Sequence, residues 1–279
     1  MENINVKQKK VDLFGKLLWL VIIISAVIVG YCVYRLVIEG ISMVETNGLI
    51  KEFDTIVEVK EVVDSDSVEL VNKEEKAIDN DYWYYTSFPL IDVDFSKLME
   101  KNKDTVAWIQ VKGTNINYPV VQASDNSYYL NHAYDGKYNT GGWLFMDYRN
   151  NSSSLEDKNT IIYGHARIDG TMLGSLSRIF YSSWVNNRDN YIVRLSTPTH
   201  NTMWQVFSVY ETPVEMYYIT TKFANDNDYS VFLDTIRSRS KYDFNTDVDI
   251  NDKVLTLSTC NGNNKRVVLH AKLIKSDNK

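Results

Sequence analysis

The chain has 279 residues, a formal charge of −6 and only two cysteines, Cys32 and Cys260, so its fold depends on a hydrophobic core and not on disulfides. Residues 1–38 carry five basic and two acidic side chains, which leaves 25 basic and 34 acidic residues and a charge of −9 for the rest. Such an acidic surface argues against binding of nucleic acid or of anionic lipid.

An uncharged apolar run at residues 17–34 is long enough to approach a membrane span, and residues 36–38 extend it beyond Arg35, which can snorkel to the interface. Four lysines precede the run and acidic residues follow it, which predicts a cytoplasmic tail at 1–16 and an extracellular remainder. A cleaved signal peptide is the alternative, but no A-x-A-like site follows the run. We therefore predict an uncleaved transmembrane anchor at 17–38.

Residues 39–88 are predicted to form an extracytoplasmic stalk and an N-terminal helical region. Ile50, Phe53 and Val57 are apolar positions at helical spacing, whereas the polar residues 64–67 indicate a break. A partly helical stalk over 39–80 would lift the following domain off the membrane. A dimerising helix is the alternative for this segment.

From residue 89 onward the pattern changes to strands, after a short helix predicted at Phe95–Lys101 with Asp94 as its N-cap. Helical spacing returns at 172–180 and at Tyr229–Arg237. The strand-like runs are rich in β-branched and aromatic residues and are separated by Gly, Asn, Asp and Ser: Ala107–Val111, Tyr118–Gln122, Trp143–Met146, Thr160–Tyr163, Tyr191–Leu195, Met203–Tyr210, Val254–Thr259 and Val267–Ile274. About eight strands with inserted helices predict a mainly β fold, a closed or nearly closed β-barrel, since closure removes exposed strand edges.

Cys260 is a candidate nucleophile, because it is the only cysteine outside the membrane segment and has no partner for an internal disulfide. A buried small hydrophobe is the alternative role. Residues 261–265 favour a five-residue hairpin loop, which would make Arg266 the cross-strand neighbour of Cys260. A guanidinium there would stabilise a thiolate or an oxyanion, whereas the alternative is an ordinary surface arginine.

A thiol near neutrality needs a base, and the chain has four histidines. His165 follows an apolar strand directly and precedes a helix, a junction at which catalytic groups are commonly presented. His270 lies inside the last strand and fits a core histidine, whereas His132 and His200 lie in polar, loop-like contexts and are expected to be solvated. The sequence assigns no Asp or Asn as a third member of a triad. It shows no phosphate loop or metal-ligand cluster, so no metal or other cofactor is expected.

The segment Thr256–Cys260, with the residues from Arg266 to Leu273 behind it, resembles the end of a class B sortase domain. The likeness covers residues 89–275, which we therefore predict to be the catalytic domain. The other matching blocks occur in the same order and at compatible spacing: Asn115–Gln122, Asp125–Leu130, Met146–Asn150, Ile161–His165 and Asp169–Met172. One departure is that the loop between Cys260 and Arg266 is shorter than this class leads us to expect.

The resemblance implies an eight-stranded sortase β-barrel behind an N-terminal transmembrane helix, on a Gram-positive cell surface. It implies a cysteine transpeptidase that cleaves a C-terminal sorting signal after Thr and joins the thioacyl intermediate to a lipid II-like peptidoglycan amine, anchoring surface proteins. By residue, it implies Cys260 as the nucleophile, His165 as the general acid/base and Arg266 as the oxyanion or substrate stabiliser. Ser258 and Thr259 would bind substrate.

Three other functions stay open from the sequence. A hydrolytic cysteine protease would release the thioacyl enzyme to water, and a pilin-polymerising sortase would take its amine from a lysine of another protein. An inactive surface-binding module would leave Cys260 no more reactive than an ordinary thiol.

Overall fold

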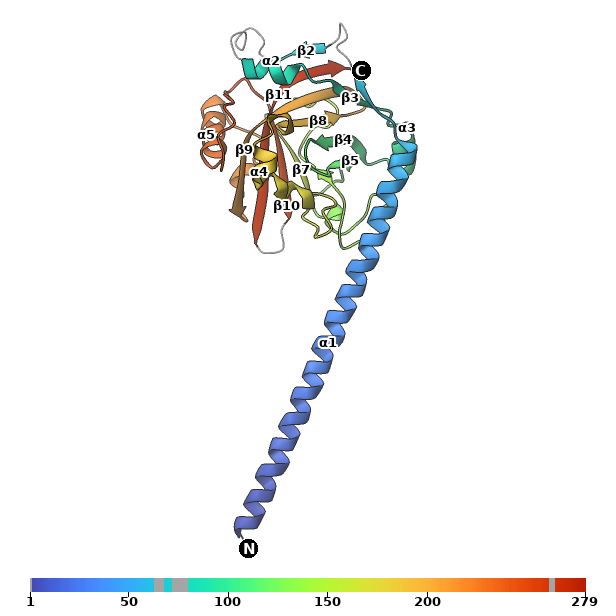
Figure 1. Cartoon of the computed structure of the whole chain (residues 1–279), viewed down its shortest axis with the longest axis vertical. Helices are drawn as coiled ribbons and strands as arrows, with labels where there is room; N and C mark the ends of the chain where they lie inside the picture. The colour runs from blue at the N-terminus through green and yellow to red at the C-terminus, as the bar shows by residue number, and fades with distance from the viewer. Residues whose placement is uncertain (1, 63–67, 72–79, 261–263) are drawn as a thin grey trace. The chain divides into compact units, whose positions relative to one another are not determined.

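The computed structural model describes residues 2–62, 68–71, 80–260 and 264–279 (Figure 1). The chain forms two compact units, one ending at Glu45 and one comprising Thr46–Lys279. Helix α1 (Glu2–Ile56) begins in the first unit and ends in the second. Within the described residues, its portion Phe14–Ile56 is the one helix long and apolar enough to cross a membrane. At 1.5 Å per residue that portion is about twice as long as the hydrocarbon core is thick, so only part of it is needed for a span.

Eight strands of the second unit close into a ring, which confirms the predicted barrel. The pairing order is β10-β7-β6-β5-β4-β8-β9-β11, and β11 pairs back with β10. The pairs β10–β7 and β5–β6 are parallel and the others are antiparallel. Each strand contains or overlaps one of the eight predicted runs: β4 (Thr105–Val111), β5 (Asn117–Val121), β6 (Phe145–Met146), β7 (Asn159–His165), β8 (Ile192–Ser196), β9 (His200–Pro213), β10 (Val254–Cys260) and β11 (Lys265–Asn278).

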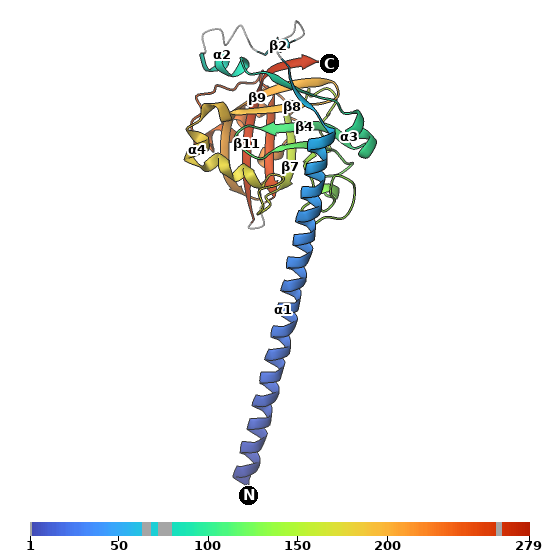
Figure 2. The ribbon, with the colours of Figure 1, turned by 45° about the vertical axis from the view of Figure 1, so that its right-hand side comes forward.

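Among the described residues, three short strands lie outside the ring. Strand β2 (Val68–Leu70) pairs with the carboxyl end of β11, which lies beside it at the top of Figures 1 and 2. Strand β1 (Val59–Val62) pairs with β3 (Leu90–Val93) as a separate two-stranded sheet. The amino end of β11 and the carboxyl end of β10 therefore lie at the opposite end of the barrel from β2.

Alternation along β10 and β11 sends apolar residues into two separate cores. Leu255, Leu257 and Leu269 belong to the large cluster inside the barrel. Val254 and Val268 face outward into a second cluster, which is covered by helix α5 (Asp226–Ser238) through Tyr229, Phe232, Leu233 and Ile236. Figure 1 shows α5 beside β9 on the outside of the barrel. This helix confirms the one predicted at 229–237, and the side chain of Asn225 caps it by accepting the Asp228 N–H.

The remaining helices are short. Helix α3 (Ser96–Lys101) begins one residue later than predicted, so its N-cap is Phe95 and the prediction of Asp94 as the N-cap was wrong. Asp94 lies one residue before the N-cap and accepts the Ser96 N–H at 2.9 Å. The helical pattern predicted at 172–180 forms the 3₁₀ helix η2 (Gly174–Phe180). The others are α2 (Asn80–Thr86), η1 (Tyr128–Leu130), α4 (Ser182–Val185), η3 (Arg188–Asn190) and η4 (Tyr217–Ile219). Helices α3 and α4 lie on different sides of the barrel (Figure 2).

Residues 46–62, which we expected in the stalk, belong to the compact barrel unit. Phe53 is 2% exposed, and its ring lies edge-on to those of Tyr134 at 4.8 Å and Trp143 at 5.7 Å between centroids. The helical spacing of Phe53 indicated a helix correctly, but spacing alone does not say what the apolar face packs against. The break expected at 64–67 lies outside the described residues, and the division of the chain at 38/39 and 88/89 stays a prediction.

Candidate active site

Strands β7 and β10 are parallel neighbours, and their register brings two of the predicted catalytic residues together. The Cα pairing runs from Val254↔Asn159 to Cys260↔His165, the last residue of each strand. Neighbouring strands lie about 5 Å apart, so the backbones of Cys260 and His165 are side by side. The sequence did not predict this pairing, because the two strands are far apart in the chain.

The imidazole of His165 is held by a backbone group. Its Nε2 atom lies 2.7 Å from the carbonyl oxygen of Leu130, at the end of η1. A carbonyl oxygen only accepts hydrogen bonds, so Nε2 carries the hydrogen and Nδ1 is the nitrogen that can exchange a proton in the neutral ring. Leu130 thus orients the ring as a triad carboxylate would, and no side-chain pattern in the sequence signals a backbone carbonyl.

Arg266 lies near the start of β11, where it pairs with Thr212 of β9. The β10–β11 register extends to Ser258↔Val268, and the Val267 N–H donates to Oγ1 of Thr259 at 2.9 Å. Continued by two residues, this register sets Arg266 opposite Cys260, and that neighbourhood stays a prediction. The predicted hairpin loop falls partly on residues 261–263, which lie outside the described residues.

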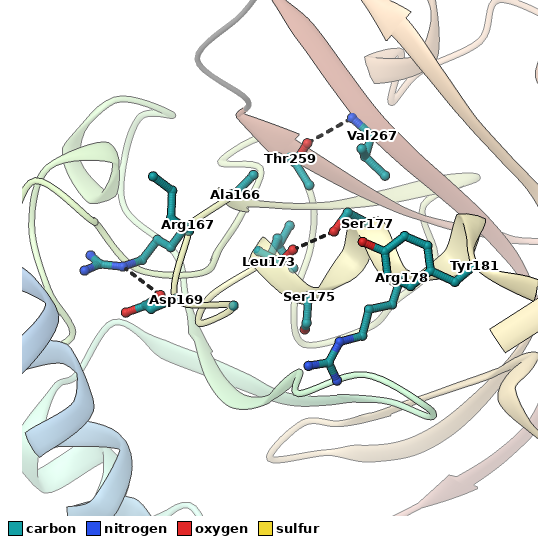
Figure 3. A pocket seen from close by; sticks show the side chains of 13 residues that line it. Ala166, Arg167, Asp169, Leu173, Ser175, Ser177, Arg178, Tyr181, Thr259 and Val267 are labelled. Carbon is teal, nitrogen blue, oxygen red and sulfur yellow. Dashed lines mark hydrogen bonds and ion pairs between the residues drawn. The ribbon is translucent and has the colours of Figure 1, made fainter. Parts of the chain in front are cut away.

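Ser258 and Thr259 lie on opposite faces of β10. The Ser258 side chain is buried, with Oγ 3.2 Å from the hydroxyl of Tyr218. Thr259 is also buried, and with Val267 it lines one side of a cleft of about 400 Å³, whose other walls come from eleven residues between Ala166 and Tyr181 (Figure 3). The two residues therefore face different spaces beside the candidate active site, and their predicted role in substrate binding stays a prediction.

His270 is a core residue and is not placed to act as the catalytic base. His270 is fully buried, and its ring nitrogens lie 2.8 Å from the Tyr210 hydroxyl and 2.9 Å from Oγ1 of Thr256. Burial lowers the pKa of His270 to about 3, so the ring is neutral and is the core histidine that its strand position suggested.

His132 and His200 are half-exposed, and each also contacts its neighbours in the chain. His132 stacks on the ring of Tyr128 at 4.0 Å and its Nδ1 lies 2.7 Å from the Tyr128 carbonyl oxygen. His200 is the first residue of β9, and its Nδ1 lies 2.8 Å from Oγ1 of Thr199. Both residues therefore keep access to solvent, as expected, although the sequence did not predict the ring stacking or the strand pairing.

A buried carboxylate supports the strand that carries His165. Burial would raise the pKa of Asp147, but hydrogen bonds from Arg149 and Tyr163 outweigh it, and the pKa is lowered. Tyr163 lies on β7 two residues before His165, and its hydroxyl donates to Asp147 at 2.9 Å. Arg149 also donates to the Ile219 carbonyl oxygen at 2.9 Å. In the sequence analysis, Asp147 and Arg149 appeared only within the block Met146–Asn150 that resembles the family, and neither residue was given a role.

Within the described part of the chain, no group of three or more His, Cys, Asp or Glu side chains is arranged to hold a metal ion.

Comparison with known proteins agrees with this geometry. A family model described as Sortase domain matches residues 109–274. The chain is 35% identical to sortase B of Listeria monocytogenes over 181 residues, which cover 63% of this chain and 72% of that protein. It is 38% identical to sortase B of Staphylococcus aureus over 185 residues, which cover 65% and 75%.

The solved structures agree as well. The crystal structure of Staphylococcus aureus sortase B matches with a TM-score of 0.61 and 38% identity, over 65% of this chain and 86% of that chain. The family model covers more than half of this chain, and the parallel pairing of Cys260 with His165 supplies a cysteine and a histidine at one point of the barrel. The chain therefore belongs to the sortase family, in class B.

Proposed function

We propose that this class B sortase uses Cys260 as its nucleophile, His165 as its general acid/base and Arg266 as its oxyanion stabiliser. A sortase of this class is a transpeptidase that anchors surface proteins to the cell wall, and the residue roles are our assignment. The observation that carries the assignment is the parallel register that ends at Cys260↔His165.

In the first half-reaction the Cys260 thiolate attacks the backbone carbonyl that follows Thr in a C-terminal sorting signal. A free thiol has a pKa of about 8.5, so a positive neighbour is needed to supply the thiolate near neutrality. Arg266 and backbone N–H groups hold the oxyanion, and Nδ1 of His165 gives its proton to the departing amine. The products are a thioacyl enzyme and a neutral His165.

In the second half-reaction an amine of a lipid II-like peptidoglycan precursor attacks the thioacyl carbon, and a new amide bond replaces the thioester. The long apolar part of α1 supports membrane anchoring of the enzyme. The lysines before the apolar run favour a cytoplasmic N-terminus and a catalytic unit outside, where sorting signals and cell-wall amines are found.

The test is to incubate the full chain in detergent micelles with a library of candidate sorting peptides and a diamino acid, with mass spectrometry as the readout. The expected products are a thioacyl adduct on Cys260 and a peptide joined to the amine. Release of free acid alone in the presence of amine would instead identify a hydrolytic protease. Absence of any cleavage, with Cys260 alkylated no faster than an ordinary thiol, would identify an inactive module.

A further inference from the structure

Three polar side chains form a row across the neighbouring strands β5, β4 and β8, none of which pairs with β10 (Figure 1). Gln110 of β4 is the direct Cα partner of Asn117 on β5 and of Arg194 on β8. Directly paired residues share one face of a sheet, so the three side chains lie on the same face with neighbouring Cβ atoms about 5 Å apart. With Lys112 and Glu61 they line a pocket of about 410 Å³ that contains none of the proposed catalytic residues.

The two amide side chains of this row offer hydrogen-bond donors to the pocket. Nε1 of Trp108 donates to Oδ1 of Asn117 at 2.8 Å, and Nη1 of Arg194 donates to Oε1 of Gln110 at 3.3 Å. Indole and guanidinium groups only donate, so these contacts decide which atom of each amide is the oxygen. Among the described residues, Nδ2 of Asn117 and Nε2 of Gln110 have no partner, and both are available to a ligand that accepts hydrogen bonds.

Arg194 is the buried charge of the pocket, since only 8% of the residue is exposed. Its Nη1 is held by Oε1 of Gln110 and by Oε1 of Glu61, which lies at 3.1 Å. Within the described part of the chain its Nε and Nη2 have no partner, and these two atoms form the edge of the guanidinium that binds two oxygens through parallel hydrogen bonds. Burial of unpaired donors is costly, so this open edge favours an anionic ligand.

The charges that line this pocket favour an anion, although the surface as a whole does not. Nζ of Lys112 lies 4.3 Å from the ring centroid of Phe88, and among the described residues it makes no ion pair. The side chain of Glu61 is 62% exposed, so water screens much of its charge. Two basic residues and one acidic residue give the described lining a charge of +1, whereas residues 39–279 carry −9. Long-range attraction therefore does not favour anions, and their binding would depend on this local set of donors.

We propose that this pocket binds a phosphate group, either as free phosphate or as part of a small phosphate ester. The Nε–Nη2 edge of Arg194 holds two of its oxygens, and the free N–H groups of Gln110 and Asn117 reach the others. A tetrahedral phosphate has oxygens for donors that come from three strands, whereas the arginine edge alone fills a planar carboxylate. The volume of about 410 Å³ is in the range of small-molecule sites, so the pocket has room for the rest of an ester. This binding site is separate from the acyl transfer proposed above.

The test is calorimetric titration of the full chain in dodecyl maltoside micelles at constant ionic strength. Inorganic phosphate, glycerol 1-phosphate and acetate are the separate titrants. The wild type should bind both phosphates, and acetate at least tenfold more weakly. Tighter binding of glycerol 1-phosphate than of inorganic phosphate would assign the pocket to an ester, and the reverse would assign it to the free anion. Equal affinities for phosphate and acetate, or no binding of either phosphate, would overturn the proposal.

Gln110→Glu and Asn117→Asp test the amide donors without a change of size. Each variant keeps the oxygen that Arg194 or Trp108 contacts and replaces the free amide nitrogen with a carboxylate oxygen. Phosphate binding should therefore weaken at least tenfold in both, while the melting temperature stays that of the wild type. Arg194→Lys should weaken it at least tenfold as well, because lysine keeps the charge but lacks the planar pair of donors.

Asn227→Asp is the matched control, since it adds the same negative charge at an exposed position on α5, outside the pocket. It should leave the phosphate affinity within twofold of the wild type. Equal weakening in Asn227→Asp and Gln110→Glu would reveal an effect of net charge alone and would overturn the pocket, as would wild-type affinity in Gln110→Glu. Peptide cleavage should stay within twofold of the wild type in all four variants, so the result does not depend on the transpeptidase assignment.

Discussion

Acidification should destabilise the barrel unit through one buried histidine, and His270→Gln should remove that effect. The pKa of His270 is about 3 in the folded chain, because burial penalises its charged form, against about 6.5 for an unperturbed histidine. A lowered folded pKa means that the stabilising contribution is complete above pH 6.5 and is lost as the pH falls toward 3. At about 1.4 kcal/mol per pKa unit, lowering the pH from 7.5 to 4.5 removes about 2.5 kcal/mol from the free energy of unfolding.

The assay is urea unfolding of residues 46–279, followed by near-ultraviolet circular dichroism at both pH values. Glutamine keeps a donor and an acceptor for Tyr210 and Thr256 but does not titrate, so the pH-dependent loss should be about 2.5 kcal/mol smaller in His270→Gln than in the wild type. Carboxylates also gain protons in this range, and they cancel in the comparison. Val268→Ala is the control, because it removes methyl groups from the same outer cluster and should lower stability equally at both pH values.

A pH-dependent loss of equal size in the wild type and in His270→Gln would refute the reasoning, since it would mean that the folded chain protonates His270 as readily as the unfolded chain does.

Four further predictions concern the site and the core. Cys260→Ala should abolish thioacyl formation and keep the wild-type melting temperature, and residual cleavage above a few per cent of the wild type would contradict its role. His165→Ala should lower kcat/KM about 10²- to 10⁴-fold in the peptide cleavage assay, whereas His200→Ala should change it little; similar losses would point to a different base. Arg266→Lys should lose about 10²- to 10³-fold in kcat/KM, close to Arg266→Ala, because lysine lacks the planar donor fork, and a fully active lysine variant would reduce the role to charge. Phe53→Ala should cost about 3–5 kcal/mol in urea unfolding, and a loss below 1 kcal/mol would show that residues 46–56 are not part of the core.

The strands were predictable because each is local and carries its own pattern. Val254–Cys260 alternates between two buried faces, and 229–237 has the spacing of an amphipathic helix, so neither needed information from elsewhere in the chain. His165 was found as a candidate because it follows an apolar strand directly, and Cys260 because it is the only cysteine outside the membrane segment. The parallel pairing of β7 with β10 joins strands that are far apart in the sequence. Local sequence patterns therefore did not predict it, and it is seen only in the structure.

The features that the sequence did not reveal depend on backbone groups or on distant partners. The Leu130 carbonyl oxygen that orients His165 has no side-chain signature, and any residue at that position could supply it. Phe53 has the same local pattern in a stalk helix as in a core helix, and only the rings of Tyr134 and Trp143 distinguish the two cases. The stacking of His132 and the strand pairing of His200 were not predicted for the same reason, since both depend on the residues that lie beside them in the fold.

The segment at residues 218–220, next to Ser258, is held through its backbone by residues that also support the candidate active site. Three consecutive carbonyl oxygens are held by side chains: Nδ2 of Asn159 donates to those of Tyr218 and Thr220 at 3.1 and 2.9 Å, and Arg149 donates to the one between them, that of Ile219. Asn159 begins β7, the strand that ends at His165, so the segment is tied to the strand that carries the catalytic base. Because all three bonds are made to backbone oxygens, the side chains of this segment can change without releasing it. Side-chain substitutions in this segment should therefore leave the register of Cys260 and His165 between β10 and β7 unchanged.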